Sequence, residues 1–488
     1  MFDKVWAHSK RIALFENIAH LVEWDQETYM PKGAAQARAE QIELLASVAH
    51  KEKNDPTFIE NVHKLGNGLE PWQKAAVREW KEEIRKAQAL PNDFVKAFAK
   101  LTSEALIAWQ EARREDNFTK FAPFLKKIVE MNRKQADYLG YEESPYDALM
   151  DLYEPGLKVS MIQPLFYKLG PELRAILEKT QEHPQIDNSC LKHKVSDERQ
   201  LDFGNKILKS MGYDLNHGRL DLSTHPFSTS MHPTDNRVTT RINPDSIFDS
   251  LSAVLHEGGH GLYEMGLNPD YFGTPVGESR SLGIHESQSR FWETLVGQSY
   301  PFWQHFYPLL QKAYKISGSL DSFYRAINRV SPSFIRVESD EVTYGLHVIL
   351  RFELEKALIE GEMEAEEIPE AWNHMMETLL GITPPTDRQG CLQDIHWSMG
   401  AFGYFPTYAL GSIYAAQFFE AFVKVYPNWE KHVAKGELLF IRDWQKEHIH
   451  KWGKMFSTEE LVKNVTGKSI TTKPYLTYLE KKYASIYK

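Results

Sequence analysis

The sequence predicts a mainly α-helical protein, built as one large body of two lobes with a small β patch near its middle. Three observations predict this fold class. Apolar residues recur at intervals of three and four along most of the chain, as on one face of a helix. Only residues 219–243 alternate instead, and they are dense in Thr, Ser, His and Pro. The chain has 488 residues, of which 42% are hydrophobic and 25% charged, so it can form a large core.

The amino-terminal half, residues 1–215, is predicted to be helical throughout. Residues 2–29 begin it, because Leu14 and Ile18 belong to an apolar series at helical spacing. The break at Pro31–Gly33 ends this first helix. Further helices of this half are expected at residues 34–50, 71–90, 93–114, 121–139, 162–182 and 197–212.

Residues 216–243 form the predicted strand patch. Leu220 and Leu222 stand two residues apart, and the same period recurs before residue 243. Turns are predicted at His232-Pro233 and at Asp235-Asn236. We therefore expect one or two short strands in this segment.

The carboxy-terminal half, residues 244–488, returns to helical spacing. Asn243 and Pro244 suit the cap and the first position of its first helix. No repeat of fixed period and no long Gly/Ser linker interrupts the chain, so residues 1–488 are predicted to form a single domain. Helices of this half are expected at residues 244–265, 282–298, 301–315, 341–361, 371–380 and 408–425.

Composition excludes several classes of function. The net charge of -10 and the pI of about 6.0 argue against nucleic-acid binding through a basic surface. The two cysteines, Cys190 and Cys391, cannot form a disulfide framework and suit a reducing compartment. The amino terminus has no apolar segment after a basic start, so we expect a cytoplasmic protein. Ser398–Phe419 carries no charge, but its glycines, proline and tyrosines predict a buried loop and helix rather than a membrane span.

The motif that carries chemistry is H-E-x-x-H, formed by His256, Glu257 and His260 in a helical context. Histidines four residues apart lie one turn above each other, so both can bind one Zn²⁺. Glu257 can then act as a base toward the water that the metal activates. The alternative is an ordinary amphipathic helix whose two histidines are structural.

A catalytic zinc also needs a third protein ligand and an open position. The metzincin pattern fails, because Tyr263 and Gly266 stand where it requires Gly and His. In the next predicted helix, either His285 or Glu286 can complete the site. Glu293, about two helical turns after Glu286, is either a partner that orients a histidine or a solvated charge.

Six motifs along most of the chain resemble those of one family, and an amino-terminal signature around Trp24–Thr28, Met30-Pro31 and Arg38–Gln41 precedes them. They are HPF at 225–227, DxRxT at 235–239, HExxH at 256–260, HESQ at 285–288, IRxxSD at 335–340 and GxxQDxHW at 390–397. The set resembles the carboxypeptidase Taq family of zinc metallocarboxypeptidases, peptidase family M32. One departure, Ser339 where the family has Ala, leaves Arg336 and Asp340 in place.

The resemblance implies that Glu286, rather than His285, is the third metal ligand. It implies a mostly helical fold with a deep active-site groove, related to neurolysin and angiotensin-converting enzyme. It also implies a homodimer and one zinc ion per chain, at a site that often accepts Co²⁺.

Catalysis by such a site needs a base and a donor to the oxyanion. Glu257 would take the proton of the attacking water and give it to the leaving amine. His396, Tyr404 and Tyr408 are the candidate donors, since related helical zinc peptidases place a His and a Tyr there. The two tyrosines could instead be aromatic core residues.

A carboxypeptidase must also recognise a free α-carboxylate, which the planar guanidinium of arginine binds with two hydrogen bonds. Arg351 and Arg336 are ranked above Arg237 for this role, although each can equally pair with an acidic neighbour. His225 and Asp235 are expected to line or close the groove. A closed groove would limit the activity to short peptides.

The function predicted from these residues is a zinc-dependent carboxypeptidase that removes single amino acids from short peptides. An endo-oligopeptidase or a dipeptidyl-carboxypeptidase with the same zinc core is the alternative. A helical binding scaffold with a vestigial site is less favoured, because Glu257 is intact.

Overall fold

Helices form most of the chain in the computed structural model, which describes residues 1–488. Those before the sheet are α1 (Phe2–Thr28), α2 (Ala35–Lys53), α3 (Pro56–Lys64), α4 (Pro71–Ala89), α5 (Asn92–Glu115), α6 (Ala122–Leu139), α7 (Pro145–Met150), α8 (Val159–Gln181) and α9 (Asp197–Met211). The sequence missed α3 and α7, which have only 9 and 6 residues. Short helices such as these carry too few turns for a periodic pattern.

The helices after the sheet continue to the end of the chain. They are α10 (Asp249–Gly266), α11 (Leu282–Arg290), α12 (Tyr300–Tyr314), α13 (Leu320–Ile327), α14 (Thr343–Glu360), α15 (Ile368–Leu380), α16 (Pro406–Val425), α17 (Trp429–Val433), α18 (Leu439–His448), α19 (Thr458–Thr466) and α20 (Lys473–Ile486). None of them meets the length and apolarity that crossing a bilayer requires. The uncharged segment noted in the sequence is a loop followed by α16, whose side chains are mostly buried.

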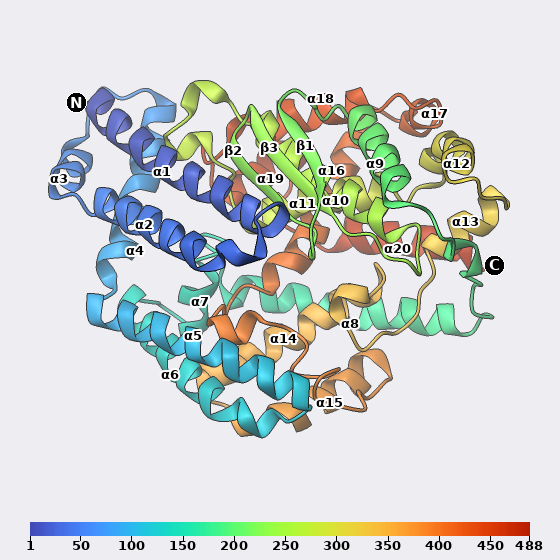
Figure 1. Ribbon diagram of the computed structural model, residues 1–488, viewed down its shortest axis with the longest axis horizontal. Helices are drawn as coiled ribbons and strands as arrows, with labels where there is room; N and C mark the ends of the chain where they lie inside the picture. The colour runs from blue at the N-terminus through green and yellow to red at the C-terminus, as the bar shows by residue number, and fades with distance from the viewer.

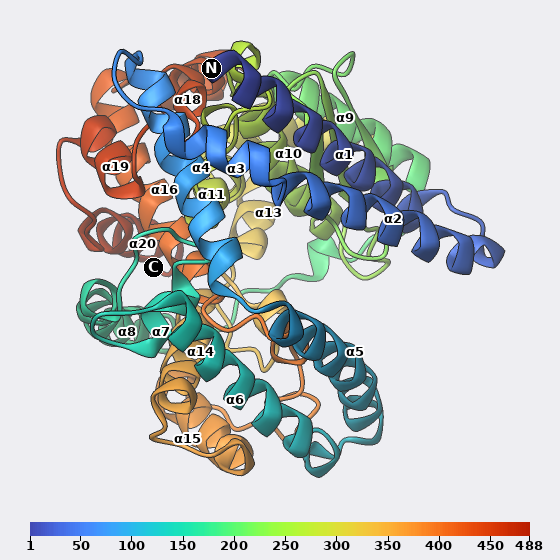
Figure 2. The same cartoon turned by 90° about the vertical axis from the view of Figure 1, so that its left-hand side faces the viewer.

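The predicted mainly α class is confirmed, because helices form most of the chain. They lie in two lobes. In Figure 2, α5, α6 and α15 lie in the lower part of the molecule, and α1, α2 and α10 lie in the upper part. The small sheet belongs to the upper part, where it packs on α10 (Figure 1). The division of the chain at residues 215 and 243 stays a prediction.

The sheet has three strands, β1 (Gly218–Leu222), β2 (Ser228–His232) and β3 (Asp235–Thr240), in the order β1-β3-β2. β1 runs parallel to β3, and β2 runs antiparallel to it. One or two strands were predicted, and the expected turn at Asp235-Asn236 is wrong because β3 begins there. Close to this sheet, a Cβ at Gly261 of α10 would lie 3.2 Å from Val238 of β3, so the missing side chain lets helix and sheet approach.

The start of α10 differs from the prediction. Asn243 does not cap this helix, which begins at Asp249. Instead, the Asn243 side chain donates to Asp249 at 2.6 Å and accepts from the backbone N–H of Asp245 at 3.0 Å. Asn243 therefore closes a turn before the helix, and this use of an Asn side chain competes with capping.

The predicted helix at residues 282–298 is divided into two parts. α11 ends at Arg290, and a π-helical turn, Phe291–Val296, follows it directly. Such turns are rare and often occur at functional sites. This one carries Glu293 and begins with Phe291, which is fully buried.

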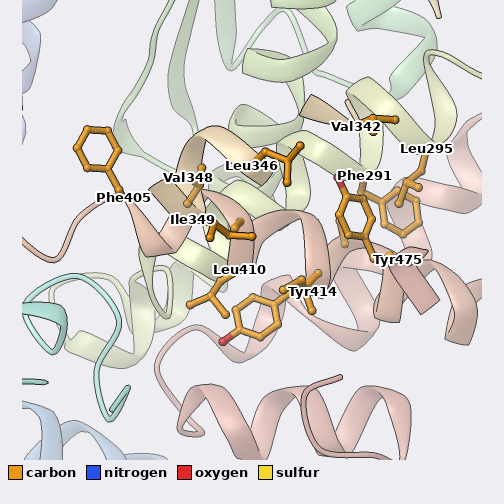
Figure 3. Close-up of a cluster of buried hydrophobic side chains, with 14 of the residues drawn as sticks. Phe291, Leu295, Val342, Leu346, Val348, Ile349, Phe405, Leu410, Tyr414 and Tyr475 are labelled. Carbon is orange, nitrogen blue, oxygen red and sulfur yellow. The ribbon is translucent and has the colours of Figure 1, made fainter. Parts of the chain in front are cut away.

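The core behind this turn joins it to three helices of the second half. Figure 3 shows buried side chains from the π-helical turn, α14, α16 and α20 packed in one cluster. The labelled residues are Phe291, Leu295, Val342, Leu346, Val348, Ile349, Phe405, Leu410, Tyr414 and Tyr475. Because interiors are close-packed, this cluster fixes α11 and α16 relative to α14.

Candidate active site

Three ligand atoms converge where α10 packs against α11. His256 and His260 stand one turn apart on α10, and Glu286 lies in the middle of α11. Nε2 of each histidine lies 3.5 Å from Oε2 of Glu286. The ligand atoms of all three residues lie within 4.8 Å of one another. Ligands that share one ion, each about 2.0–2.2 Å from it, have separations of this size.

Glu293 determines which nitrogen of His256 faces the ligand cluster. A carboxylate only accepts hydrogen bonds, so Nδ1 of His256 carries the proton that it donates to Glu293 at 2.8 Å. Nε2 is then the nitrogen that faces the cluster, and it offers its lone pair to a metal that displaces its proton. Arg290 and Ser252 also donate to Glu293, at 2.9 and 2.8 Å. These contacts make Glu293 an orienting partner of His256 and not a solvated charge.

His285 plays the corresponding part for His260. Nε2 of His285 lies 2.8 Å from the carboxylate of Glu264, and its Nδ1 lies 2.5 Å from Nδ1 of His260. Since Glu264 must accept, Nε2 of His285 donates, and Nδ1 of His285 accepts from His260. His260 is thereby left with its Nε2 lone pair directed to the cluster. The geometry thus favours Glu286 over His285 as the third ligand.

The charges around the cluster suit a bound cation. Burial lowers the pKa of His256, yet Glu286 and Glu293 together raise it to about 10. Burial lowers the pKa of His260 to about 4, so this imidazole is neutral at pH 7. Two imidazoles and one carboxylate are a donor set that zinc prefers. The residues present therefore fit a divalent metal ion.

Two glycines allow the helices to approach at this point. A Cβ at Gly259 of α10 would lie 2.6 Å from the carbonyl oxygen of Gln288 on α11. A Cβ at Gly411 of α16 would overlap the side chain of Glu286. Small residues at both contacts let α11 pack between α10 and α16, with Glu286 toward the histidines.

Glu257 lies beside the ligands and is 7% exposed. Burial raises its pKa to about 7; His256 opposes this rise, and Glu286 adds to it. A carboxyl group that titrates near neutral pH can both accept and return a proton. The position of Glu257 next to His256 therefore suits a general base.

A second group of polar side chains lies on the segment before α16 and on the first turn of that helix. The ring of Tyr404 lies 5.2 Å from that of His396 and 5.3 Å from that of Tyr408, between centroids. The Tyr408 hydroxyl lies 3.4 Å from Nε2 of His396. Burial lowers the pKa of His396 to about 4, so it is neutral. Burial raises the pKa of both tyrosines, and the charge of Glu286 contributes, because the group lies near the ligand cluster.

Arg336 borders this group, with its guanidinium 4.9 Å from the centre of the Tyr408 ring. Nε and Nη2 donate to Asp394 at 3.2 and 2.9 Å, which leaves Nη1 without a carboxylate partner.

Tyr344 lies nearby and was missed by the sequence analysis. Burial raises its pKa to about 12, and both Arg336 and Glu286 act on it. Its only signal in the sequence is that it follows the motif at 335–340 by four residues.

The position of Arg351 corrects an expectation. Nε donates to Asp394 at 2.7 Å, Nη2 to Gln393 at 2.8 Å, and Nη1 to the carbonyl oxygen of His347 at 2.7 Å. The residue is 0% exposed, so no nitrogen is left to meet a substrate carboxylate. Of the arginines considered, Arg336 is better placed than Arg351 for that contact.

Arg237 and Asp235 form a pair at the start of β3. Nε of Arg237 donates to Asp235 at 3.0 Å, and the guanidinium lies 4.2 Å from the ring centre of Trp24 on α1. His225 lies exposed in the turn between β1 and β2, and its imidazole makes no hydrogen bond. The structure shows no contact between these residues and the ligand cluster.

A cavity of about 870 Å³ lies next to the hydrogen-bond chain behind His260. α1, α4 and the edge strand β2 contribute to its walls, and Glu264 and His285 also line it. Space of this size beside a catalytic helix can admit part of a peptide.

A two-lobed helical body with two histidines on one helix, a glutamate on the next, and a buried acid beside them defines a helical metallopeptidase. Comparisons with known proteins agree. Residues 4–483 match the family described as Carboxypeptidase Taq (M32) metallopeptidase. Thermostable carboxypeptidase 1 of Thermus thermophilus is 41% identical, over 100% of this chain and 99% of its own. Carboxypeptidase 1 of Bacillus subtilis is 37% identical, over 98% of this chain and 97% of its own.

Solved structures lead to the same family. The carboxypeptidase of Pyrococcus furiosus superimposes with a TM-score of 0.96 at 37% identity, covering 99% of this chain and 98% of that one. The M32 carboxypeptidase of Deinococcus radiodurans has a TM-score of 0.97 at 34% identity, with 99% of both chains covered. The chain belongs to the M32 family of metallocarboxypeptidases, so it is a peptide-bond hydrolase.

Proposed function

We propose that this metallocarboxypeptidase uses zinc, with Glu257 as its general base, to remove single amino acids from the carboxyl end of short peptides. The observation that carries the proposal is the cluster of His256, His260 and Glu286. In it, Glu293 and His285 orient the two Nε2 lone pairs toward one point. A zinc ion bound there supplies a Lewis acid that activates water and polarises a carbonyl.

Glu257 moves the proton in this proposal. As a carboxylate it accepts a proton from the attacking water, and as a carboxylic acid it returns that proton to the leaving amine. Its pKa of about 7 makes both steps accessible near neutral pH. The acid lies beside both histidine ligands on the same helix, so no large movement is needed.

His396, Tyr404 and Tyr408 act as donors to the oxyanion that forms at the cleaved carbonyl. Neutral His396 has one N–H to donate, and the raised pKa of each tyrosine keeps its hydroxyl protonated. Donors that are already in place cost no reorganisation during the reaction. Tyr344 is a further candidate because it lies near both Arg336 and Glu286.

Arg336 binds the α-carboxylate of the peptide through the side of its guanidinium that Asp394 leaves free. In this proposal Arg237, His225 and Asp235 close the far end of the substrate groove, and the stacking of Arg237 on Trp24 of α1 supports a wall there. A bound peptide would meet this wall on its amino-terminal side. This arrangement supports short peptides as the substrate class.

Digestion of an amino-terminally blocked peptide ladder, followed by mass spectrometry, tests the proposal. Release of one carboxy-terminal residue at a time is the expected result. Internal cuts or released dipeptides would instead support the endo-oligopeptidase or dipeptidyl-carboxypeptidase alternative. Repeating the digest with longer peptides measures the limit on length.

The metal and the assembly are tested separately. Elemental analysis of purified protein is expected to give one zinc per chain, and Co²⁺ added to the metal-free protein is expected to restore activity. Light scattering on the same preparation is expected to give the mass of a homodimer. A cytoplasmic location is part of the proposal and can be checked by cell fractionation.

A further inference from the structure

One buried carboxylate holds both ends of the segment that follows His396. Glu355 of α14 is 0% exposed and accepts three hydrogen bonds. Nε1 of Trp397 donates to Oε1 at 2.8 Å, and the backbone N–H of Gly403 donates to Oε2 at 2.9 Å. The hydroxyl of Tyr146 on α7 also donates to Oε2, at 2.6 Å. Trp397 directly follows His396, and Gly403 directly precedes Tyr404.

Glu355 is the last of four buried polar residues on one face of α14. Thr343, His347, Arg351 and Glu355 stand four residues apart and are each 0% exposed. Arg351 holds the same segment further upstream, through Gln393 and Asp394. One helix face therefore attaches residues 393–403 at several points, on both sides of His396.

The position of Gly403 shows how little freedom the segment has. Its φ is +87°, which favours glycine, and a Cβ there would lie 2.7 Å from backbone atoms of Leu149 and Met150. A buried carboxyl group is retained at such a place only when its hydrogen bonds are satisfied. Both oxygens of Glu355 meet that condition, and two of the three donors belong to the segment.

We propose that Glu355 is a positioning residue that sets the location of His396 and Tyr404 relative to the reacting carbonyl. This inference rests on the proposed function, in which those two side chains stabilise the oxyanion. Glu355 itself touches neither the substrate nor the metal ligands. Its effect is therefore on the transition state and not on metal binding.

The test compares Glu355→Gln with Glu353→Gln, which removes the same charge from the same helix at a half-buried position off the buried face. In Glu355→Gln the amide oxygen can still accept a hydrogen bond. The amide NH₂ group, however, faces an N–H or O–H group that is itself a donor, so a hydrogen bond is lost there. We expect kcat to fall on the order of 10- to 100-fold, the effect of a misplaced catalytic group. Metal content is expected to stay at one ion per chain.

A second measurement separates positioning from a general loss of structure. A phosphonate analogue of a dipeptide resembles the tetrahedral transition state, whereas the free product amino acid does not. In Glu355→Gln, affinity for the phosphonate is expected to fall by the same factor as kcat, with product affinity unchanged. Equal losses for both ligands, or an unchanged kcat, would overturn the proposal.

Trp397→Phe tests the same contact from its other side, so its result does not depend on whether Glu355→Gln folds. It removes one donor and keeps an aromatic ring, so a smaller loss in kcat and in phosphonate affinity is expected. The double variant is expected to be no worse than Glu355→Gln alone, because both changes act through one contact. Full additivity would contradict a shared contact.

His396→Ala distinguishes this inference from the proposed function. If His396→Ala leaves phosphonate affinity intact, the oxyanion assignment fails, and the inference fails with it. If His396→Ala weakens the phosphonate and Glu355→Gln does not, only the positioning role is overturned.

Discussion

Glu257 is the residue whose loss is expected to separate chemistry from metal binding. It lies next to the ligands but is not one of the three residues whose ligand atoms converge. Glu257→Gln keeps size and burial while removing the ability to take a proton, so kcat is expected to fall about 10²- to 10⁴-fold. Metal content measured on the same sample should be unchanged. Full activity in this variant would exclude Glu257 as the base.

Glu293 is expected to act on metal affinity instead. Its charge fixes the tautomer of His256, and partners of this kind are worth about 10- to 100-fold in affinity. Glu293→Gln should therefore weaken zinc binding by that factor in a competition with a chelating dye. Glu370→Gln, an exposed acid on α15, is the matched control. Equal zinc affinity in both variants would mean that Glu293 does not orient the ligand.

At this scale the sequence predicted the residues whose spacing on one helix determines their geometry. His256, Glu257 and His260 are of this kind. The role of His285 was left open, because it depends on Glu264, which lies one turn beyond the motif. Arg351 was misjudged for a similar reason: its partner Asp394 is 43 residues away, and no local pattern indicates that the two are buried together.

The helices depend on close contact to bring the ligands together, and Gly411 tests this dependence. Gly411→Ala places a methyl group where the side chain of Glu286 lies, so α16 and α11 must separate. Overpacking of this kind costs about 1–3 kcal/mol of stability. Because Glu286 would move, we expect zinc affinity to fall together with the melting temperature.

Gly33→Ala is the control for that experiment. No atom lies within 4 Å of the added Cβ, and the backbone there is not in the left-handed region. Its melting temperature and zinc affinity are expected to match those of the parent protein. A Gly411→Ala variant that also matched the parent would show that the α11–α16 contact can relax without moving Glu286.

The elements were predicted best where they are long. The starts of α4 and α6 follow from Pro71 and Pro123, which lie in their first turns. The π-helical turn after α11 and the late start of α10 could not be predicted in the same way. The late start of α10 results from the side-chain turn at Asn243, and the π-helical turn carries side chains that pack into the core. Helix propensity describes neither of these effects.

Across the whole molecule, the site is assembled from segments that lie far apart in sequence. α10 and α11 supply the ligand cluster, and the segment before α16 supplies His396 and Tyr404. Tyr146, from the amino-terminal half, donates a hydrogen bond to Glu355, which holds that segment. The motifs identified which residues meet, but not that α14 carries the buried polar face behind them. Arg351, which belongs to this face, was predicted to contact the substrate, because its burial depends on the complete fold.

Burial of this face makes the free energy of unfolding depend on pH, and His347 determines the direction of its contribution. Burial, and after it the charge of nearby Arg351, lowers the pKa of His347 to about 3. Nε2 lies 3.0 Å from the carbonyl oxygen of Ser333, to which it donates, and Nδ1 is buried without a partner. A second proton would therefore have to be placed on Nδ1, in a site with no acceptor.

Because the pKa in the folded state is below the ordinary value of about 6.5, the unfolded chain binds this proton first. The stabilising contribution is present above pH 6.5 and is lost as pH falls toward 3. Between pH 7 and pH 5 the loss from His347 is about 2 kcal/mol. His347→Gln can keep a donor to Ser333 but does not titrate. In urea unfolding of the metal-free protein, the free energy of unfolding should fall less in the variant than in the parent between pH 7 and pH 5, by that amount. Equal falls in both proteins would mean that His347 is already protonated in the fold.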